Sequence, residues 1–178
     1  MISIHICINL KMNNFTIAGQ NQIINFIYMK GICPMIEQDT IKLLRECDAG
    51  VKMAISSIDD VLPYVSDEEF KNKLNRCRDE HHKLDDELQS LLDKYHDDGK
   101  EPQPIAKGMS WLKTNIMLIL NESDTTIADL MMDGCNMGVK TLNKYLNEYK
   151  GADEVSKDIT KKLINLEDKL AVDIRKYL

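Results

Sequence analysis

The sequence predicts an all-α protein whose main part is a single bundle of four helices. Apolar residues recur in steps of three and four through residues 35–178, the period of helices that bury one face. Only 8 Gly and 4 Pro occur among 178 residues, too few turn residues for a protein of many short strands. A chain of this length buries a sizeable core without disulfides.

The first 34 residues differ in composition from the rest. They contain two charged side chains, Lys11 and Lys30, and no acid. Every second residue from Ile2 to Ile8 is isoleucine, which is typical of a short edge strand. The alternative is a translated leader, since codons for Lys30 and the following glycine can form a purine-rich ribosome-binding run shortly before Met35. We therefore treat 1–34 as an extension outside the core and 35–178 as the bundle.

The first predicted hairpin joins a helix over about Ile36 to Leu62 with a second helix that starts a few residues later. Pro63 ends the first helix, and Ser66 with Glu69 predicts a capping box for the second. Gly99 and the prolines after it stop the second helix. The apolar face of this second helix consists of Phe70, Leu74, Cys77, His81, Leu84, Leu88, Leu91 and Tyr95.

A long connection from Tyr95 to Asp124 leads to a second hairpin. Within it we expect a shorter helix over Ile105 to Leu120. A long helix then covers about Thr125 to Tyr149 and ends at Gly151, and Asp153 is the expected N-cap of the last helix.

The two hairpins resemble each other in sequence. The hexapeptide Cys47 to Lys52 recurs as Cys135 to Lys140, and the apolar positions around the two copies match. Two similar antiparallel hairpins with a long connection between them predict an antiparallel four-helix bundle of approximate two-fold symmetry, with the connection crossing its length.

The paired hairpins, the long crossover and the Gly-Met-Ser-Trp segment at 108–111 resemble the ferritin-like superfamily, and within it bacterial four-helix domains of unknown function. The resemblance covers 35–178 and implies a ferritin-like bundle with a helical crossover. Members of that superfamily that bind two irons use a Glu on each of two helices and Glu-x-x-His on the other two. Here the matching positions hold Asp79, His82, Asn165, Asp168 and Asp133. This degraded pattern disfavours a di-iron oxidase.

Two polar residues, His81 and Glu167, interrupt apolar helix faces. Counting residues from the hairpin turns places Cys47 opposite His81 and Cys135 opposite Glu167. Two thiolates, an imidazole and a carboxylate form a plausible zinc site, and iron is a further candidate. The sequence favours a simpler interpretation, a buried His81–Glu167 pair beside cysteines that pack as small apolar residues, because the imidazole lowers the cost of burying the carboxylate. Exposed side chains are the third possibility.

Several functions are disfavoured by composition. The net charge of −6 and 6% aromatic residues argue against a nucleic-acid surface, and no run of about 20 apolar residues predicts a membrane helix. Five cysteines without a Cys-x-x-Cys motif are typical of free thiols in the cytoplasm. No phosphate loop, nucleophile elbow or dinucleotide motif occurs. We expect a cytoplasmic, bacterial, non-catalytic interaction or structural protein, with the apolar segment Trp111 to Leu120 as the surface for a homodimer or another protein.

Overall fold

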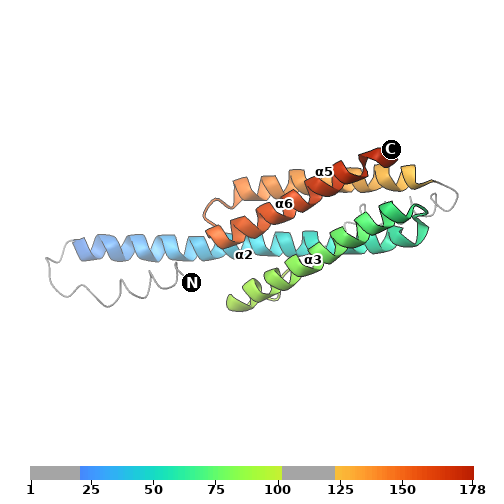
Figure 1. Cartoon of the computed structure of the whole chain (residues 1–178). Coiled ribbons are helices and arrows are strands. Elements are labelled where there is room, and N and C mark those ends of the chain that lie inside the picture. The colour runs from blue at the N-terminus through green and yellow to red at the C-terminus, as the bar shows by residue number, and fades with distance from the viewer. Residues whose placement is uncertain (1–20, 102–122) are drawn as a thin grey trace.

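The computed structural model of the chain describes the backbone of residues 21–101 and 123–178, and the side chains within these ranges from Ile36 onward. This part of the chain contains the helices α2 (Asn21–Val61), α3 (Glu68–Lys94), α5 (Asp124–Glu148) and α6 (Glu154–Ile174), with short 3₁₀ turns η1 (Leu62–Tyr64) and η2 (Arg175–Tyr177). The helices form two antiparallel hairpins, α2–α3 and α5–α6, packed into one bundle (Figure 1). The predicted all-α four-helix bundle is confirmed for these residues.

Two predicted helix boundaries agree closely with the structure, and one does not. The helix expected over Thr125 to Tyr149 runs from Asp124 to Glu148. The first helix, expected from Ile36, begins at Asn21 and continues through Pro34. A change in composition does not stop a helix, and an internal proline removes only one backbone hydrogen bond. The strand expected over Ile2 to Ile8 and the helix expected over Ile105 to Leu120 lie outside the described residues.

Aspartates cap the second helix of each hairpin. The prediction for α6 is confirmed, since Asp153 Oδ1 accepts the Ser156 N–H at 2.8 Å. The prediction of Ser66 as cap of α3 is wrong: Asp67 Oδ1 accepts the Phe70 N–H at 2.7 Å, so α3 begins one residue later than that cap implied. A carboxylate interacts more strongly than a hydroxyl with the positive end of a helix, which favours Asp67.

Contacts between the hairpins show the direction of each helix. Along α3 and α6 the paired residues run in opposite senses, because the Phe70 ring stacks on Tyr177 whereas Lys162 contacts Glu87. Helices α2 and α6 run in the same sense, since Thr40 contacts Asp153 and Cys47 contacts Thr160 further along both. Helices α3 and α5 are therefore also parallel to each other, so the end of α3 and the start of α5 lie at opposite ends of the bundle.

The core has two apolar sections. One surrounds the α2–α3 turn and includes Phe70, Leu74, Ile127 and Ile174, all fully buried. The other lies toward the opposite end of the bundle and includes Leu43, Leu44, Val51, Leu88, Leu92 and Leu163. Both sections receive side chains from both hairpins, so the hairpins share one interior. Among the described helices, none is long and apolar enough to span a membrane.

Each hairpin turn is held by a carboxylate from the other hairpin. Asp124, the first residue of α5, accepts the N–H groups of Ser66 and Asp67, each at 2.7 Å. In return Asp39 of α2 accepts the Gly151 N–H at 2.9 Å. A Cβ at Gly151 would lie 2.8 Å from the Asp39 carboxylate, so a larger residue here would displace that side chain. Residues of α2 before Asp39 extend past this end of the bundle (Figure 1).

Replacing Asp124 with alanine removes the acceptor for two turn N–H groups, and we expect a loss of about 1 to 2 kcal/mol in unfolding free energy. Urea denaturation followed by circular dichroism measures it. Asp129→Ala, at an exposed position on the same helix, is the matched control and should change stability by less than about 0.5 kcal/mol. Equal losses in the two variants would show that Asp124 does not hold the turn.

Candidate functional site

The predicted buried pair of His81 and Glu167 is present. His81 lies on α3 and is fully buried, and Glu167 lies on α6 with 8% of its surface exposed. His81 Nε2 and Glu167 Oε1 are 3.1 Å apart. On both helices the pair lies between the residues of the two apolar core sections, so it forms a polar layer inside the bundle.

The hydrogen bonds of His81 define how many protons the pair holds. His81 Nδ1 lies 2.9 Å from the carbonyl oxygen of Cys77, which only accepts, so Nδ1 carries a proton and donates it. A hydrogen bond between Nε2 and Glu167 then requires one more proton, carried either by the imidazole or by the carboxyl group. In both forms the pair as a whole is electrically neutral, which lowers the cost of burying it.

Two thiols complete this site, which we name the buried polar cluster: Cys77, His81, Cys135 and Glu167. Cys77 Sγ lies 3.5 Å from His81 Nδ1, and the Cys135 thiol hydrogen-bonds the Glu167 carboxyl group. Gly138, three residues after Cys135 on α5, brings the backbone close to Glu167, since a Cβ there would lie 3.6 Å from its Cδ. Helices α3, α5 and α6 all contribute to the cluster.

Burial keeps the thiols of the cluster protonated. Burial, and next the electrostatic effect of Glu167, raise the pKa of Cys77 to about 12 from an ordinary value of about 9. Burial followed by Glu167 also raises the pKa of Cys135. A nucleophile must be a thiolate, so neither thiol is prepared for nucleophilic chemistry in this environment.

Cys47 does not lie opposite His81 as expected. Its Sγ is 3.2 Å from Thr160 Oγ1, in the other apolar section, and burial raises its pKa to about 12. Arg78 of α3 pairs with Asp59 of α2 across the first hairpin. Because the two helices are antiparallel, His81, three residues after Arg78, lies level with residue 56 of α2. This level is about 13 Å along the helix from Cys47.

The wrong placement of Cys47 opposite His81 comes from the turn between α2 and α3. Counting residues from a turn assumes that both arms leave it at the same height, whereas η1 and residues 65–67 carry the chain past the end of α2 before α3 begins. Cys77, which the sequence analysis left out of the site, takes the place of Cys47. Its position four residues before His81 on the same helix face was the signal that could have identified it.

The geometry does not gather ligands around one point. The two ring nitrogens of His81 face different partners, Cys77 on one edge and Glu167 on the other. Within residues 36–101 and 123–178, no three His, Cys, Asp or Glu side chains are arranged to hold a metal ion. The residues at the positions of the di-iron pattern are all exposed on the outer faces of the helices: Asp79, His82, Asp133, Asn165 and Asp168. A zinc or iron site from Cys47, His81, Cys135 and Glu167 remains a prediction.

Comparison of the chain with protein-family models, with curated proteins and with solved structures found no match. What is established is therefore a four-helix all-α bundle of two hairpins. The more specific ferritin-like resemblance stays a hypothesis drawn from the sequence.

Removing one partner of the His81–Glu167 pair leaves a buried polar group without its hydrogen bond. We expect His81→Leu and Glu167→Met each to lower the unfolding free energy by about 3 kcal/mol. The double variant should lie within about 1 kcal/mol of the wild type, because both polar groups are gone. Urea unfolding of all four proteins gives the coupling energy, and additive losses would contradict the pair.

The raised thiol pKa values predict that Cys47 and Cys77 do not react with a thiol reagent in the folded protein at pH 8, where too little thiolate forms. Labelling in the native state and in guanidinium, with peptides resolved by mass spectrometry, measures each thiol separately. Both peptides should be labelled fully only after unfolding. Rapid native labelling of either thiol would contradict the burial described.

Proposed function

We propose that this chain is a non-catalytic ferritin-like bundle that acts as an interaction or structural protein. The observation that supports this most is that the buried polar cluster satisfies itself. His81 is fully buried, and its two ring nitrogens are both partnered within the protein. A catalytic acid or base must reach a substrate proton within about 3 Å, which this arrangement does not offer.

The surroundings of the cluster support the same proposal. A hollow between α3 and α6, lined by Arg76, Cys77 and Lys169 among others, has a volume of about 100 Å³. Pockets that bind drug-sized ligands measure about 300–1,000 Å³. On this proposal the cluster has a structural role. It makes one register of α3 against α6 more favourable than the shifted registers, because a shifted helix would leave the polar groups unpaired.

The proposed contact surface is the segment Trp111 to Leu120, which lies outside the described residues. The proposal rests on its composition, one Trp followed by a nearly continuous apolar end. The occupant is a second copy of the chain or another protein in the cytoplasm. The acidic balance of the chain, −6 overall, argues against nucleic acid as the partner.

A metal-binding bundle is the second candidate, since the buried polar cluster contains the sulfur, nitrogen and oxygen donors of Cys135, His81 and Glu167. Zinc is the metal such donors suit best, and a di-iron oxidase would need carboxylates that this core lacks at the described positions. Elemental analysis of protein purified without chelator distinguishes the two candidates. One equivalent of zinc that is lost in His81→Leu would overturn the non-catalytic proposal in favour of metal binding.

The interaction proposal predicts that a Trp111→Ser variant loses self-association or partner binding by at least tenfold, because it removes the largest apolar side chain of the surface. Sedimentation of purified protein measures self-association, and chemical cross-linking in extract followed by mass spectrometry measures partner binding. The double variant His81→Leu with Glu167→Met is the control, since it alters only the core and should behave as the wild type.

Two outcomes would contradict this proposal. Unchanged association in Trp111→Ser would exclude the surface. Iron-dependent oxygen consumption that disappears when Glu167 is replaced would exclude a non-catalytic role.

A further inference from the structure

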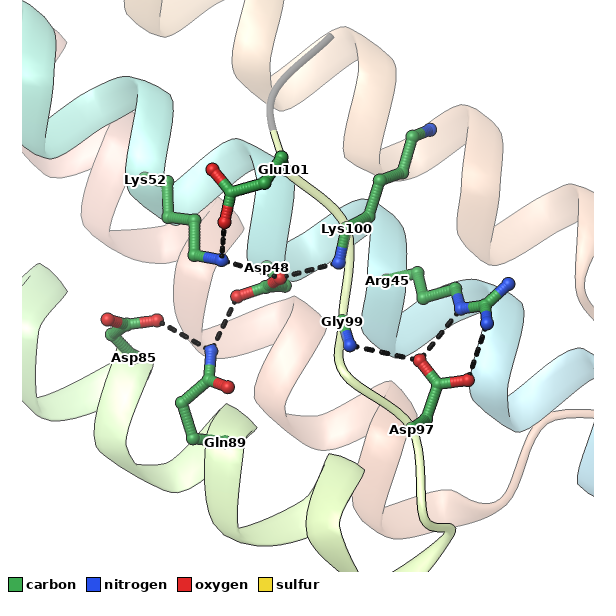
Figure 2. Close-up of polar contacts among 9 residues, drawn as sticks. All are labelled: Arg45, Asp48, Lys52, Asp85, Gln89, Asp97, Gly99, Lys100 and Glu101. Atoms are coloured by element: carbon green, nitrogen blue, oxygen red, sulfur yellow. Dashed lines mark hydrogen bonds and ion pairs between the residues drawn. The ribbon is translucent and has the colours of Figure 1, made fainter.

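After α3 the chain folds back along α2, over residues 96–101, which we name the strap. Its contacts follow α2 in order: Asp97 meets Arg45, Lys100 meets Asp48, and Glu101 meets Lys52 (Figure 2). The strap therefore runs parallel to α2, toward the end of the bundle where α5 begins. Positive φ angles at His96 (54°) and Gly99 (75°) make this reversal possible.

The centre of these contacts is the carboxylate of Asp48, which is completely buried. Its Oδ2 accepts the backbone N–H of Lys100 at 2.8 Å and lies 3.3 Å from Lys52 Nζ. Its Oδ1 accepts the Gln89 side chain of α3 at 2.7 Å. One buried charge thus joins α2, α3 and the strap, and its hydrogen bonds offset the cost of removing it from water (Figure 2).

Other contacts on the strap are closer to solvent. Arg45 binds Asp97 through two hydrogen bonds of 2.8 and 2.6 Å, and Asp97 also accepts the Gly99 N–H. The Arg45 guanidinium, more than the Gly99 N–H, holds the pKa of Asp97 below its usual range. Partly exposed ion pairs of this kind contribute little individually because water and salt screen them. The buried Asp48 is therefore the main fastening.

Gly99 fits the strap closely against the core. A Cβ at this position would collide with the Asp48 carboxylate and would lie 3.1 Å from Leu92 Cδ1. Leu92 is fully buried and belongs to the second apolar section of the core. The strap thus lies over the edge where α2 and α3 meet and covers the last buried residue of α3.

We propose that the strap is a closing device and that Asp48 is its latch. In the closed form the strap covers Leu92. When Asp48 releases it, the strap opens while the four helices stay packed. Among the described residues, the hydrogen bonds between the strap and α2 all involve side chains of α2 and none involves the backbone of α2. Opening therefore breaks none of the backbone hydrogen bonds of α2. This goes beyond the proposed function and does not depend on it.

Amide hydrogen exchange followed by NMR tests the latch at single residues in the full chain. In Asp48→Asn the buried acceptor loses its charge and one of its two acceptor oxygens. We expect the Lys100 and Gly99 amides to exchange at least tenfold faster, while amides in the middle of α5 and α6 keep their protection. Asp85→Asn is the matched control, since Asp85 contacts the same Gln89 at 3.3 Å but not the strap.

A second variant keeps the carboxylate and displaces the strap. Gly99→Ala forces a Cβ against Asp48 at a positive φ, and should give the same local loss of protection. Gly134→Ala, where a Cβ meets nothing within 4 Å, is its control. Wild-type exchange at Lys100 in both Asp48→Asn and Gly99→Ala would overturn the proposal. A loss of protection spread evenly over all four helices would also overturn it, because Asp48 would then hold the bundle rather than the strap.

Discussion

Backbone N–H groups in the three described connections need acceptors, and aspartates from neighbouring helices supply them. Asp124 accepts from the first hairpin turn, Asp39 from the second and Asp48 from the strap. Each aspartate is distant in sequence from the N–H that it accepts. Asp124 and Asp39 each join one hairpin to the other, whereas Asp48 joins the strap to its own hairpin. The cost of leaving the turn N–H groups without partners in the folded protein therefore favours one arrangement of the two hairpins.

The buried polar cluster also favours one arrangement of the helices, through contacts in the core. The His81–Glu167 pair separates two apolar core sections, and a helix shifted by one turn would leave its polar groups buried without partners. A shift of α6 would take Glu167 away from His81 and from the Cys135 thiol together. Glu167 also contributes to the raised pKa values of the Cys77 and Cys135 thiols, so both thiols stay protonated.

The repeated hexapeptides show how far sequence similarity extends into contacts. Asp48 is buried and fastens the strap, whereas its counterpart Asn136 is exposed. Cys47 contacts Thr160 in one core section, and Cys135 contacts Glu167 beside the other. The origin of the hairpins by duplication stays a hypothesis. What the copies share is a helical pattern, and the neighbours that pack on each copy decide its role.

The sequence by itself determined the number and type of the described helices, most of their ends apart from the start of α2, and the burial of His81 with Glu167. These features follow from local periodicity, caps and the cost of an unpaired buried charge, all of which can be counted along the chain. The tertiary structure alone decided that Cys77 rather than Cys47 joins the pair, and that Asp48 fastens the strap. The position of Cys77 four residues before His81 was a signal in the sequence, but the displacement of Cys47 from the pair follows from the offset between the hairpin arms, which the path of the turn sets. The contact of Asp48 with the strap follows from packing between residues about 50 positions apart, which residue spacing does not encode.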